Sequence, residues 1–429
     1  MRKYRFLLYL LFLSNTIFGQ LENAKRITKT LCSKEFYGRG YVNQGDSIAA
    51  RFIGDEFQKI GLEKLNNNSF YQSFANPVVS FPNVMTVVIN KDTLVPGIDY
   101  LVDPNCGSSN LTWKYTQLTK EDLFDSEIQK RYISSVHKDA LNISGVVIDI
   151  RGLKGDSLKR IRIEVIPGLA QQLDVLVLTD EKFTFSVGNE PLPYSLIYIK
   201  GNKFSSNASI TTHIKSNYLI SHLSTNVIGM IPALPNKKRK EKDTKTIFIT
   251  AHYDHLGMMG KDVYFPGAND NASGVAMLLE LANYFKKNPI NYNVVFVAFA
   301  GEEAGLLGSS YFVQYPWIPL EKIHFLLNLD IMGSGEEGIT VVNATLHQEQ
   351  FQKLQEINEK EKLVDLIKSR GEAANSDHYW FSQRKVPAFF IYTMGPNKNY
   401  HDIYDTYDNL SFAKFENIFK LLSSFINNL

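Results

Sequence analysis

Several acidic residues and histidines directly follow apolar, β-branched runs in the second half of the chain. They are His252 and Asp254 after residues 245–251, Glu302 and Glu303 after residues 293–300, Asp330 after residues 323–329, and His401 a short loop after residues 388–392. In an open parallel sheet, ligands bind outside the carboxyl ends of the strands. If these runs are strands of one sheet, strand order permitting, the fold brings their polar ends to one rim.

The residue types in this set are those that bind zinc, which takes imidazole nitrogen and carboxylate oxygen as ligands. Two ions about 3.5–4 Å apart need one carboxylate that bridges them. Asp270 suits the bridge, because it lies in the loop 266–274, which can present both of its oxygens. The remaining expected ligands are His252 and Asp330 for one ion and Glu303 and His401 for the other.

Two further acidic residues have expected roles beside the ligands. Glu302 is adjacent to a ligand and is not needed as one, so it could take a proton from metal-bound water. Asp254 lies two residues beyond His252 and points the same way in a strand-like stretch. We expect the Asp254 side chain to accept the second ring N–H of His252 and fix its tautomer. Each residue alone has an ordinary explanation as a turn or a helix start, and the prediction depends on the whole set.

Alternating strands and helices are predicted to position these residues. The run 293–300 is continuously apolar, as expected of a strand buried on both faces. Residues 245–251, 323–329 and 388–392 predict further strands, and residues 275–285 an amphipathic helix. This alternation predicts an α/β fold with a largely parallel sheet.

The first half of the chain has a different pattern. Residues 21–62 predict helices, because apolar residues recur at helical spacing and Gly61 closes the pattern. Short β-rich runs separated by turn signals follow from about residue 82 to residue 214. We interpret residues 82–214 as a mostly β insertion.

Composition and the N-terminal residues bound the class of protein. The chain has 429 residues, 44% of them hydrophobic, and a formal net charge of +2, which favours a globular protein without a nucleic-acid or membrane-surface partner. A charged start and an apolar run before Gly19 predict a secretory signal peptide. A membrane anchor is the alternative, but the run is shorter than the roughly 20 residues of a span. We therefore expect an exported protein, periplasmic or secreted, without stable membrane insertion. The basic run 237–242 is interpreted as a solvated hairpin tip.

Two cysteines, Cys32 and Cys106, are present. Export makes a disulfide possible, and two buried free thiols are equally consistent with the sequence. Two cysteines without suitable neighbours do not make a cysteine zinc site.

Six motifs together identify a family resemblance. They are AHYDHLG from Ala251, PGANDNASG from Pro266, FAGEEAGLLGS from Phe299, NLDIMG from Asn328, SDH from Ser376 and YHDIYDT from Tyr400. In the order and spacing of these motifs, residues 226–429 resemble the di-zinc aminopeptidase family that includes secreted bacterial leucyl aminopeptidases and aminopeptidase Y. The resemblance implies a zinc-exopeptidase fold with a mixed sheet, two zinc ions on the ligand set above, and Glu302 as the general base.

The resemblance extends less specifically to other segments. Residues 82–214 resemble a protease-associated domain, and the stretch LCSKEFYGRGY from Leu31 resembles the start of such exported enzymes. The implied organisation is a signal peptide (1–19), the N-terminal part of a peptidase domain (20–81), the protease-associated-like insertion (82–214) and the zinc peptidase domain (215–429).

Some positions depart from the family pattern or receive no role. The loop around the last histidine often reads His-Thr-Pro-x-Asp-Thr, whereas here Asp402 follows His401, and we expect it to alter the local charge. Asn269 stands where many relatives have an acidic residue, with little expected effect. The nearby residues without an assigned role are His255, Asp377 and His378.

The predicted function is hydrolysis of the first peptide bond of peptides with a free N-terminus. A glutaminyl cyclase on the same scaffold is one alternative, although it uses a single zinc ion and the full ligand set argues against it. A carboxypeptidase for acidic C-terminal residues would need a basic pocket, for which Arg370 is the nearby candidate. A non-catalytic binding module is the third alternative, and such proteins lose ligands that this chain retains.

Overall fold

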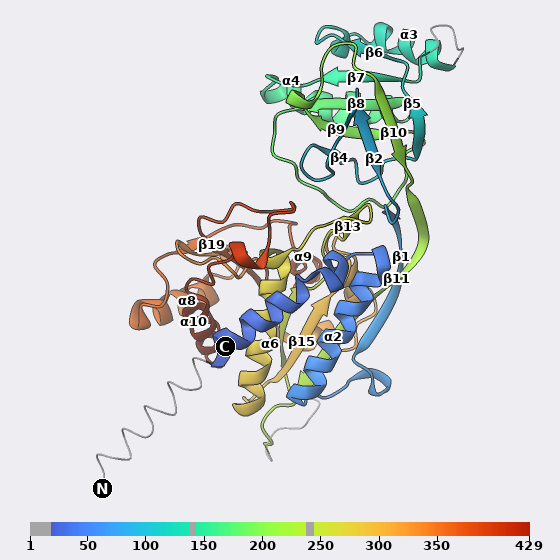
Figure 1. Ribbon diagram of the computed structural model, residues 1–429. Coiled ribbons are helices and arrows are strands. Elements are labelled where there is room, and N and C mark those ends of the chain that lie inside the picture. The colour runs from blue at the N-terminus through green and yellow to red at the C-terminus, as the bar shows by residue number, and fades with distance from the viewer. Residues whose placement is uncertain (1–18, 138–142, 237–243) are drawn as a thin grey trace.

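The computed structural model describes residues 19–137, 143–236 and 244–429, apart from a few side chains (Figure 1). The predicted signal peptide, except Gly19, and the basic run 237–242 lie outside the described residues. Within the described ranges, no helix is long and apolar enough to cross a membrane. Figure 1 shows two bodies, which are joined by the long strands β1 (Tyr71–Ser80) and β11 (Asn217–Ile231).

The larger body is built on an eight-stranded sheet in the order β1-β11-β15-β12-β16-β19-β17-β18. Its other strands are β12 (Thr246–His252), β15 (Asn293–Phe299), β16 (Ile323–Leu329), β17 (Gly338–Val342), β18 (Ile367–Ser369) and β19 (Ala388–Met394). The strands β15, β12, β16 and β19 are mutually parallel neighbours, and β11 and β17 pair antiparallel with β15 and β19. The predicted α/β fold with a mixed, largely parallel sheet is confirmed.

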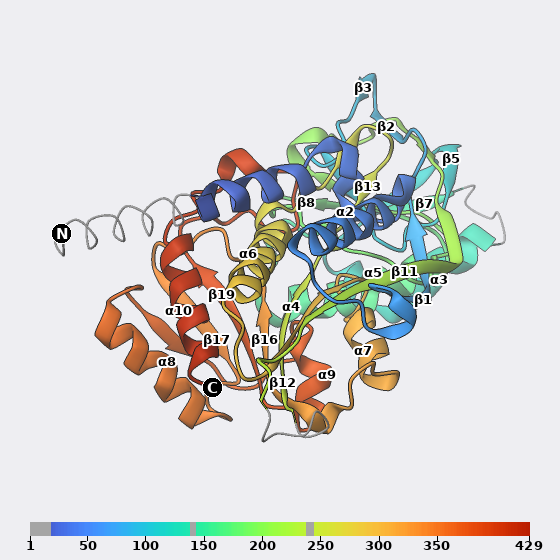
Figure 2. The same ribbon diagram turned by 90° about the horizontal axis from the view of Figure 1, so that it is seen from below.

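Helices cover both faces of this sheet (Figure 2). One face packs against a helix over residues 19–31 and against α2 (Gly45–Ile60), α6 (Gly274–Lys287) and α10 (Phe415–Asn427), with α8 (Gln348–Glu361) beside α10. The other face packs against α7 (Leu307–Gln314) and α9 (His378–Gln383) through a second apolar cluster. Gly61 ends α2 in the left-handed region, at φ +82°, as its position in the pattern predicts.

The smaller body consists of residues 82–214, which are named here the inserted domain. It has a five-stranded sheet of β4 (Tyr100–Val102), β9 (Leu196–Lys200), β8 (Asp174–Thr179), β7 (Gly145–Asp149) and β6 (Tyr115–Leu118). A four-stranded sheet consists of β3 (Asp92–Thr93), β2 (Thr86–Ile89), β10 (Ile210–Ile214) and β5 (Ser109–Thr112).

The inserted domain contains helices as well as the expected short strands. The helices are α3 (Ser126–His137), α4 (Gly155–Arg160) and α5 (Ile166–Ala170). Strands β6, β7, β8 and β9 are parallel neighbours, and parallel strands need crossover connections. The crossover from β8 to β9, residues 180–195, has no helix, and its Phe185 contacts His401 of the larger body.

An apolar cluster joins the two bodies. Phe183 and Phe185 of the inserted domain pack in the same cluster as Leu256, Met259 and Phe265 of the larger body. The hairpin of β13 (Met258–Met259) and β14 (Val263–Tyr264) contributes to this junction. Cys32 and Cys106 are buried, free thiols, so the free-thiol alternative is confirmed.

Candidate metal centre

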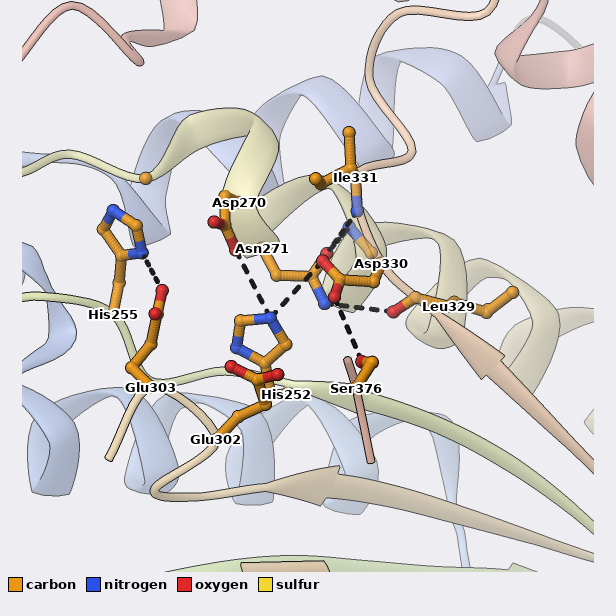
Figure 3. Close-up of polar contacts among 12 residues, drawn as sticks. His252, His255, Asp270, Asn271, Glu302, Glu303, Leu329, Asp330, Ile331 and Ser376 are labelled. Carbon is orange, nitrogen blue, oxygen red and sulfur yellow. Dashed lines mark hydrogen bonds and ion pairs between the residues drawn. The ribbon is translucent and has the colours of Figure 1, made fainter. Parts of the chain in front are cut away.

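The predicted ligands meet at one rim of the large sheet, and Figure 3 shows four of the five, all except His401. His252 is the last residue of β12, the central strand, while Glu303 and Asp330 follow its two parallel neighbours, β15 and β16. His401 follows β19, and Asp270 lies in the irregular turn before α6. The parallel strand order therefore brings these five side chains together from segments far apart in the chain.

His252, Asp270 and Asp330 form the first half of the centre, named here the His252 half. The Nε2 atom of His252 lies 3.3 Å from Asp270 Oδ1 and 3.4 Å from Asp330 Oδ1. The His252 nitrogen and the Asp330 oxygen are buried and have no hydrogen-bond partner. Buried polar atoms without partners are costly unless another group satisfies them, so these converging atoms fit a cation.

His401, Glu303 and again Asp270 form the second half, named here the His401 half. The Nε2 atom of His401 lies 3.1 Å from Asp270 Oδ2 and 3.1 Å from Glu303 Oε2. Asp270 therefore turns one carboxylate oxygen towards each histidine. This is the arrangement that a carboxylate bridging two ions requires.

Asp405 and Arg39 hold the backbone of the Asp270 loop. The Asp405 carboxylate accepts hydrogen bonds from the amides of Asn269 (2.9 Å) and Asp270 (3.0 Å). The fully buried Arg39 guanidinium donates to five backbone carbonyls, those of Leu31, Tyr253, Pro266, Gly267 and Asp270. A buried guanidinium is tolerated where its donors are satisfied. Arg39 was not predicted as a functional residue, and its only signal in the sequence was its place in the stretch LCSKEFYGRGY.

The expected partner of His252 is corrected by the structure. Its Nδ1 atom lies 3.2 Å from the backbone carbonyl of Asp254, whereas the Asp254 carboxylate is 3.9 Å away. The chain leaves the strand at His252, so the strand-like alternation behind the prediction no longer applies. The Asp254 carboxylate instead accepts the amides of Glu302 (3.1 Å) and Glu303 (3.3 Å) and fixes that turn.

Three other residues of the motifs also reach the site. His255 Nδ1 lies 2.7 Å from Glu303 Oε1, and the Ser376 hydroxyl donates to Asp330 Oδ2 at 3.1 Å (Figure 3). Asp377 is fully buried beside them. His255 follows His252 by three residues, and Ser376 and Asp377 belong to the SDH motif, so the motifs carried a signal that the ligand pattern alone did not use.

Burial and crowding strongly shift the pKa values of the acidic groups. Burial raises the pKa of Glu302 well above its usual range, and the charges of Glu303 and Asp377 add to this against the opposing charge of His252. Burial likewise raises the pKa values of Asp254 and Asp377 to about 7. So many buried carboxylates are compatible with ionisation only near a strong positive charge, which divalent cations would supply.

The histidines show the complementary shift. Burial would lower the pKa of His401, but Glu303 and Asp270 outweigh it and raise this pKa to about 11. The charges of Asp330 and Glu302 likewise raise the pKa of His252 well above its usual range against the effect of burial. A metal ion replaces the proton on a histidine ligand, so ion binding at this centre would release protons.

The fold and the rim together define the zinc-exopeptidase class of α/β fold. The sequence model of peptidase family M28 matches residues 226–426 of this chain. The structure is similar to that of a zinc aminopeptidase from Bacillus subtilis, at 18% identity and a TM-score of 0.69, over 95% of this chain and 94% of that one. An aminopeptidase from Aneurinibacillus sp. strain AM-1 is similar at 21% identity and a TM-score of 0.63, over 94% and 92% of the two chains. At these identities, the likeness shows a shared fold over most of the chain.

Curated relatives align over shorter stretches. Aminopeptidase YwaD from Bacillus subtilis is 34% identical over 125 residues, which are 29% of this chain and 25% of YwaD. A probable zinc metalloprotease from Pyricularia oryzae is 39% identical over 97 residues, 22% of this chain and 19% of that protein. The chain thus spans a quarter or less of the length of these two relatives.

Proposed function

We propose that this protein is an aminopeptidase that hydrolyses the first peptide bond of peptides with a free N-terminus, using two zinc ions. The observation that carries the proposal is the position of Asp270, whose two oxygens lie 3.3 and 3.1 Å from the Nε2 atoms of His252 and His401. Asp330 would complete the ligands of the ion in the His252 half, and Glu303 would complete those of the ion in the His401 half. When bound, two such zinc ions lower the pKa of a shared water and polarise the scissile carbonyl.

Glu302 is the proposed general base, which takes a proton from the attacking water and delivers it to the leaving amine. One of its oxygens lies within 4.8 Å of potential ligand atoms of His252 and Glu303, so it stands beside the ligands. Burial raises its pKa in the absence of metal ions, and the positive charge of bound ions would keep the carboxylate ionised and able to accept a proton. The bond from its amide to Asp254 fixes the backbone from which the side chain projects.

The alternatives make different demands on the site. A glutaminyl cyclase would need one ion, and the presence of ligands for a second ion in the His401 half argues against this alternative. A carboxypeptidase for acidic residues would need a buried basic group, whereas Arg370 is exposed and donates to the Tyr392 hydroxyl at 3.3 Å. Export through the predicted signal peptide and a protease-associated type for residues 82–214 are parts of the same proposal.

A peptide-library experiment tests the function. The zinc-loaded protein is incubated with peptides that have free or acetylated N-termini, and the products are identified by mass spectrometry. Loss of single N-terminal residues from free peptides only is expected. Glu302→Gln should slow this loss on the order of 10³-fold with unchanged zinc content, because the base acts in the reaction and is not a ligand.

The matched control is Glu349→Gln, which changes an exposed glutamate on α8 and should leave the rate unchanged. Release of C-terminal residues, or of ammonia from N-terminal glutamine, would assign the protein to one of the other enzyme classes. Zinc binding without any product would favour the binding module.

A further inference from the structure

The crossover between β8 and β9 of the inserted domain touches the loop that carries His401. The Phe185 amide donates to the His401 carbonyl at 2.8 Å, and the His401 ring Nδ1 lies 3.1 Å from the Phe185 carbonyl. Because Nε2 faces the carboxylates of the centre, an Nδ1–H donated to this carbonyl leaves Nε2 free to bind an ion. The inserted domain thus supplies the group that sets the tautomer and direction of this histidine.

A second contact uses the residue at which this chain departs from the family pattern. Asp402, whose side chain is 5% exposed, forms an ion pair with Lys182 Nζ at 2.5 Å, and Lys182 also donates to the Lys398 carbonyl at 2.6 Å. The other Asp402 oxygen accepts the Tyr404 amide at 2.8 Å. Asp402 therefore fastens the His401 loop to the inserted domain and does not point its charge at the ligands.

Packing supports the same junction. The Phe185 ring stacks on Phe265, with ring centroids 4.8 Å apart and planes 10° apart. Ile403 lies against Gly97, where an added Cβ would be 3.0 Å from the Ile403 Cγ2 atom. His401 itself has a left-handed backbone, at φ +53°. A residue with a side chain keeps this conformation where its surroundings hold it, and the two backbone groups of Phe185 are among the contacts that hold it here.

We propose that Lys182 and Phe185 are positioning residues for His401, so that the ion of the His401 half binds tightly only when the inserted domain is docked. The inference rests on the two-ion centre proposed above. It assigns the inserted domain a part in building the metal centre, through a backbone carbonyl and an ion pair. The His252 half has no such dependence, since the Nδ1 partner of His252 is the Asp254 carbonyl of its own rim.

The test is a Co²⁺ titration of the metal-depleted protein, followed by the visible absorption bands of the bound ion. The wild-type protein should bind two ions in separable steps. Lys182→Met should weaken the second step about 10–100-fold and leave the first unchanged, because it loosens the junction that holds the Phe185 carbonyl against His401, and loss of such an outer partner has effects of this size. Phe185→Ala should do the same, and Lys182→Arg should restore the second step.

Lys159→Met is the matched control, because Lys159 is an exposed lysine on α4 of the same domain. Unchanged second-step binding in both Lys182→Met and Phe185→Ala would overturn the inference, as would equal weakening of both steps. A wild-type protein that binds a single ion would overturn both this inference and the two-ion centre.

The titration does not depend on peptide hydrolysis. If two ions bind but no peptide is cleaved, the aminopeptidase proposal fails and the variants still decide the role of the inserted domain. If peptides are cleaved and the variants bind both ions normally, only the role of the inserted domain fails.

Discussion

The two halves of the candidate metal centre are held in different ways. In the His252 half, the side chains of His252 and Asp330 are 1% and 9% exposed and come from the ends of paired central strands. In the His401 half, the histidine is 15% exposed, lies on a loop, and finds its Nδ1 partner 216 residues away in another domain. A sheet can fix the first half alone, whereas the second depends on how two bodies fit together. We therefore expect unequal affinities for the two ions.

The largest effect is expected where the two halves meet. Asp270→Asn retains the size of the side chain but loses its charge and one of its two acceptor oxygens, so both ions should be lost or strongly weakened. Activity should fall on the order of 10³-fold or more, because the ions carry both activation of the water and polarisation of the carbonyl. Metal content and initial rates of the purified variant check this, with the exposed Asp262→Asn as the control. Retention of one tightly bound ion would show that Asp270 does not bridge.

The next largest effect separates the halves. His401→Ala should leave one tightly bound ion in the His252 half and reduce activity on the order of 10²-fold. His252→Ala should leave an ion that is lost more readily, because the remaining half sits on the loop that the inserted domain must hold. Elemental analysis after passage over a chelating resin compares the two variants. The opposite order of retention would contradict the comparison between the halves.

The residues at the rim of the sheet were predictable because each strand, and the polar residue that follows it, can be recognised from a short stretch of sequence. The strand β16 matches the predicted run 323–329, and β12, β15 and β19 match theirs within two residues. Continuous apolar runs identify buried parallel strands, and a polar residue at the end of each run can lie only at the carboxyl edge of the sheet. The meeting of His252 and Asp330 follows from this rule, while their role as metal ligands stays a prediction.

The contacts that hold the rim were not predictable in the same way. Arg39 binds backbone carbonyls, and a carbonyl is present at every residue, so no side-chain pattern marks its partners. The Phe185 carbonyl that faces His401 has the same property. The parallel pairing within the inserted domain was also missed, because short β-rich runs show neither strand order nor crossover helices.

Substitution of Arg39 tests whether a residue can stabilise both halves of the metal centre, in contrast to Lys182, which is proposed to act on the His401 half alone. Arg39→Met leaves five carbonyl partners without their donor in a buried place, and we expect the free energy of unfolding to fall by about 3 kcal/mol. Because Arg39 holds the loop of the shared Asp270, both Co²⁺ binding steps should weaken, in contrast to Lys182→Met. Urea unfolding and the Co²⁺ titration measure the two effects, with the exposed Arg384→Met as the control. Weakening of a single step would show that Arg39 supports only one half.

The smallest effect concerns a buried carboxylate outside both halves, which shows what burial alone does to an acidic group. Glu280 on α6 is 2% exposed and accepts a hydrogen bond from Asn23, and burial raises its pKa from 4.5 to about 7. The folded protein therefore binds this proton more tightly than the unfolded chain, so stability falls as the pH rises from about 4.5 to about 7 and then levels off. Glu280→Gln has no charge to bury and should be more stable than the wild type by about 2 kcal/mol at pH 8, but by little at pH 4.5. Urea unfolding at the two pH values, with Glu349→Gln as the exposed control, measures this difference. A difference that is the same at both pH values would show that the Glu280 charge is compensated in the fold, and burial alone would then not explain the shifts at the rim.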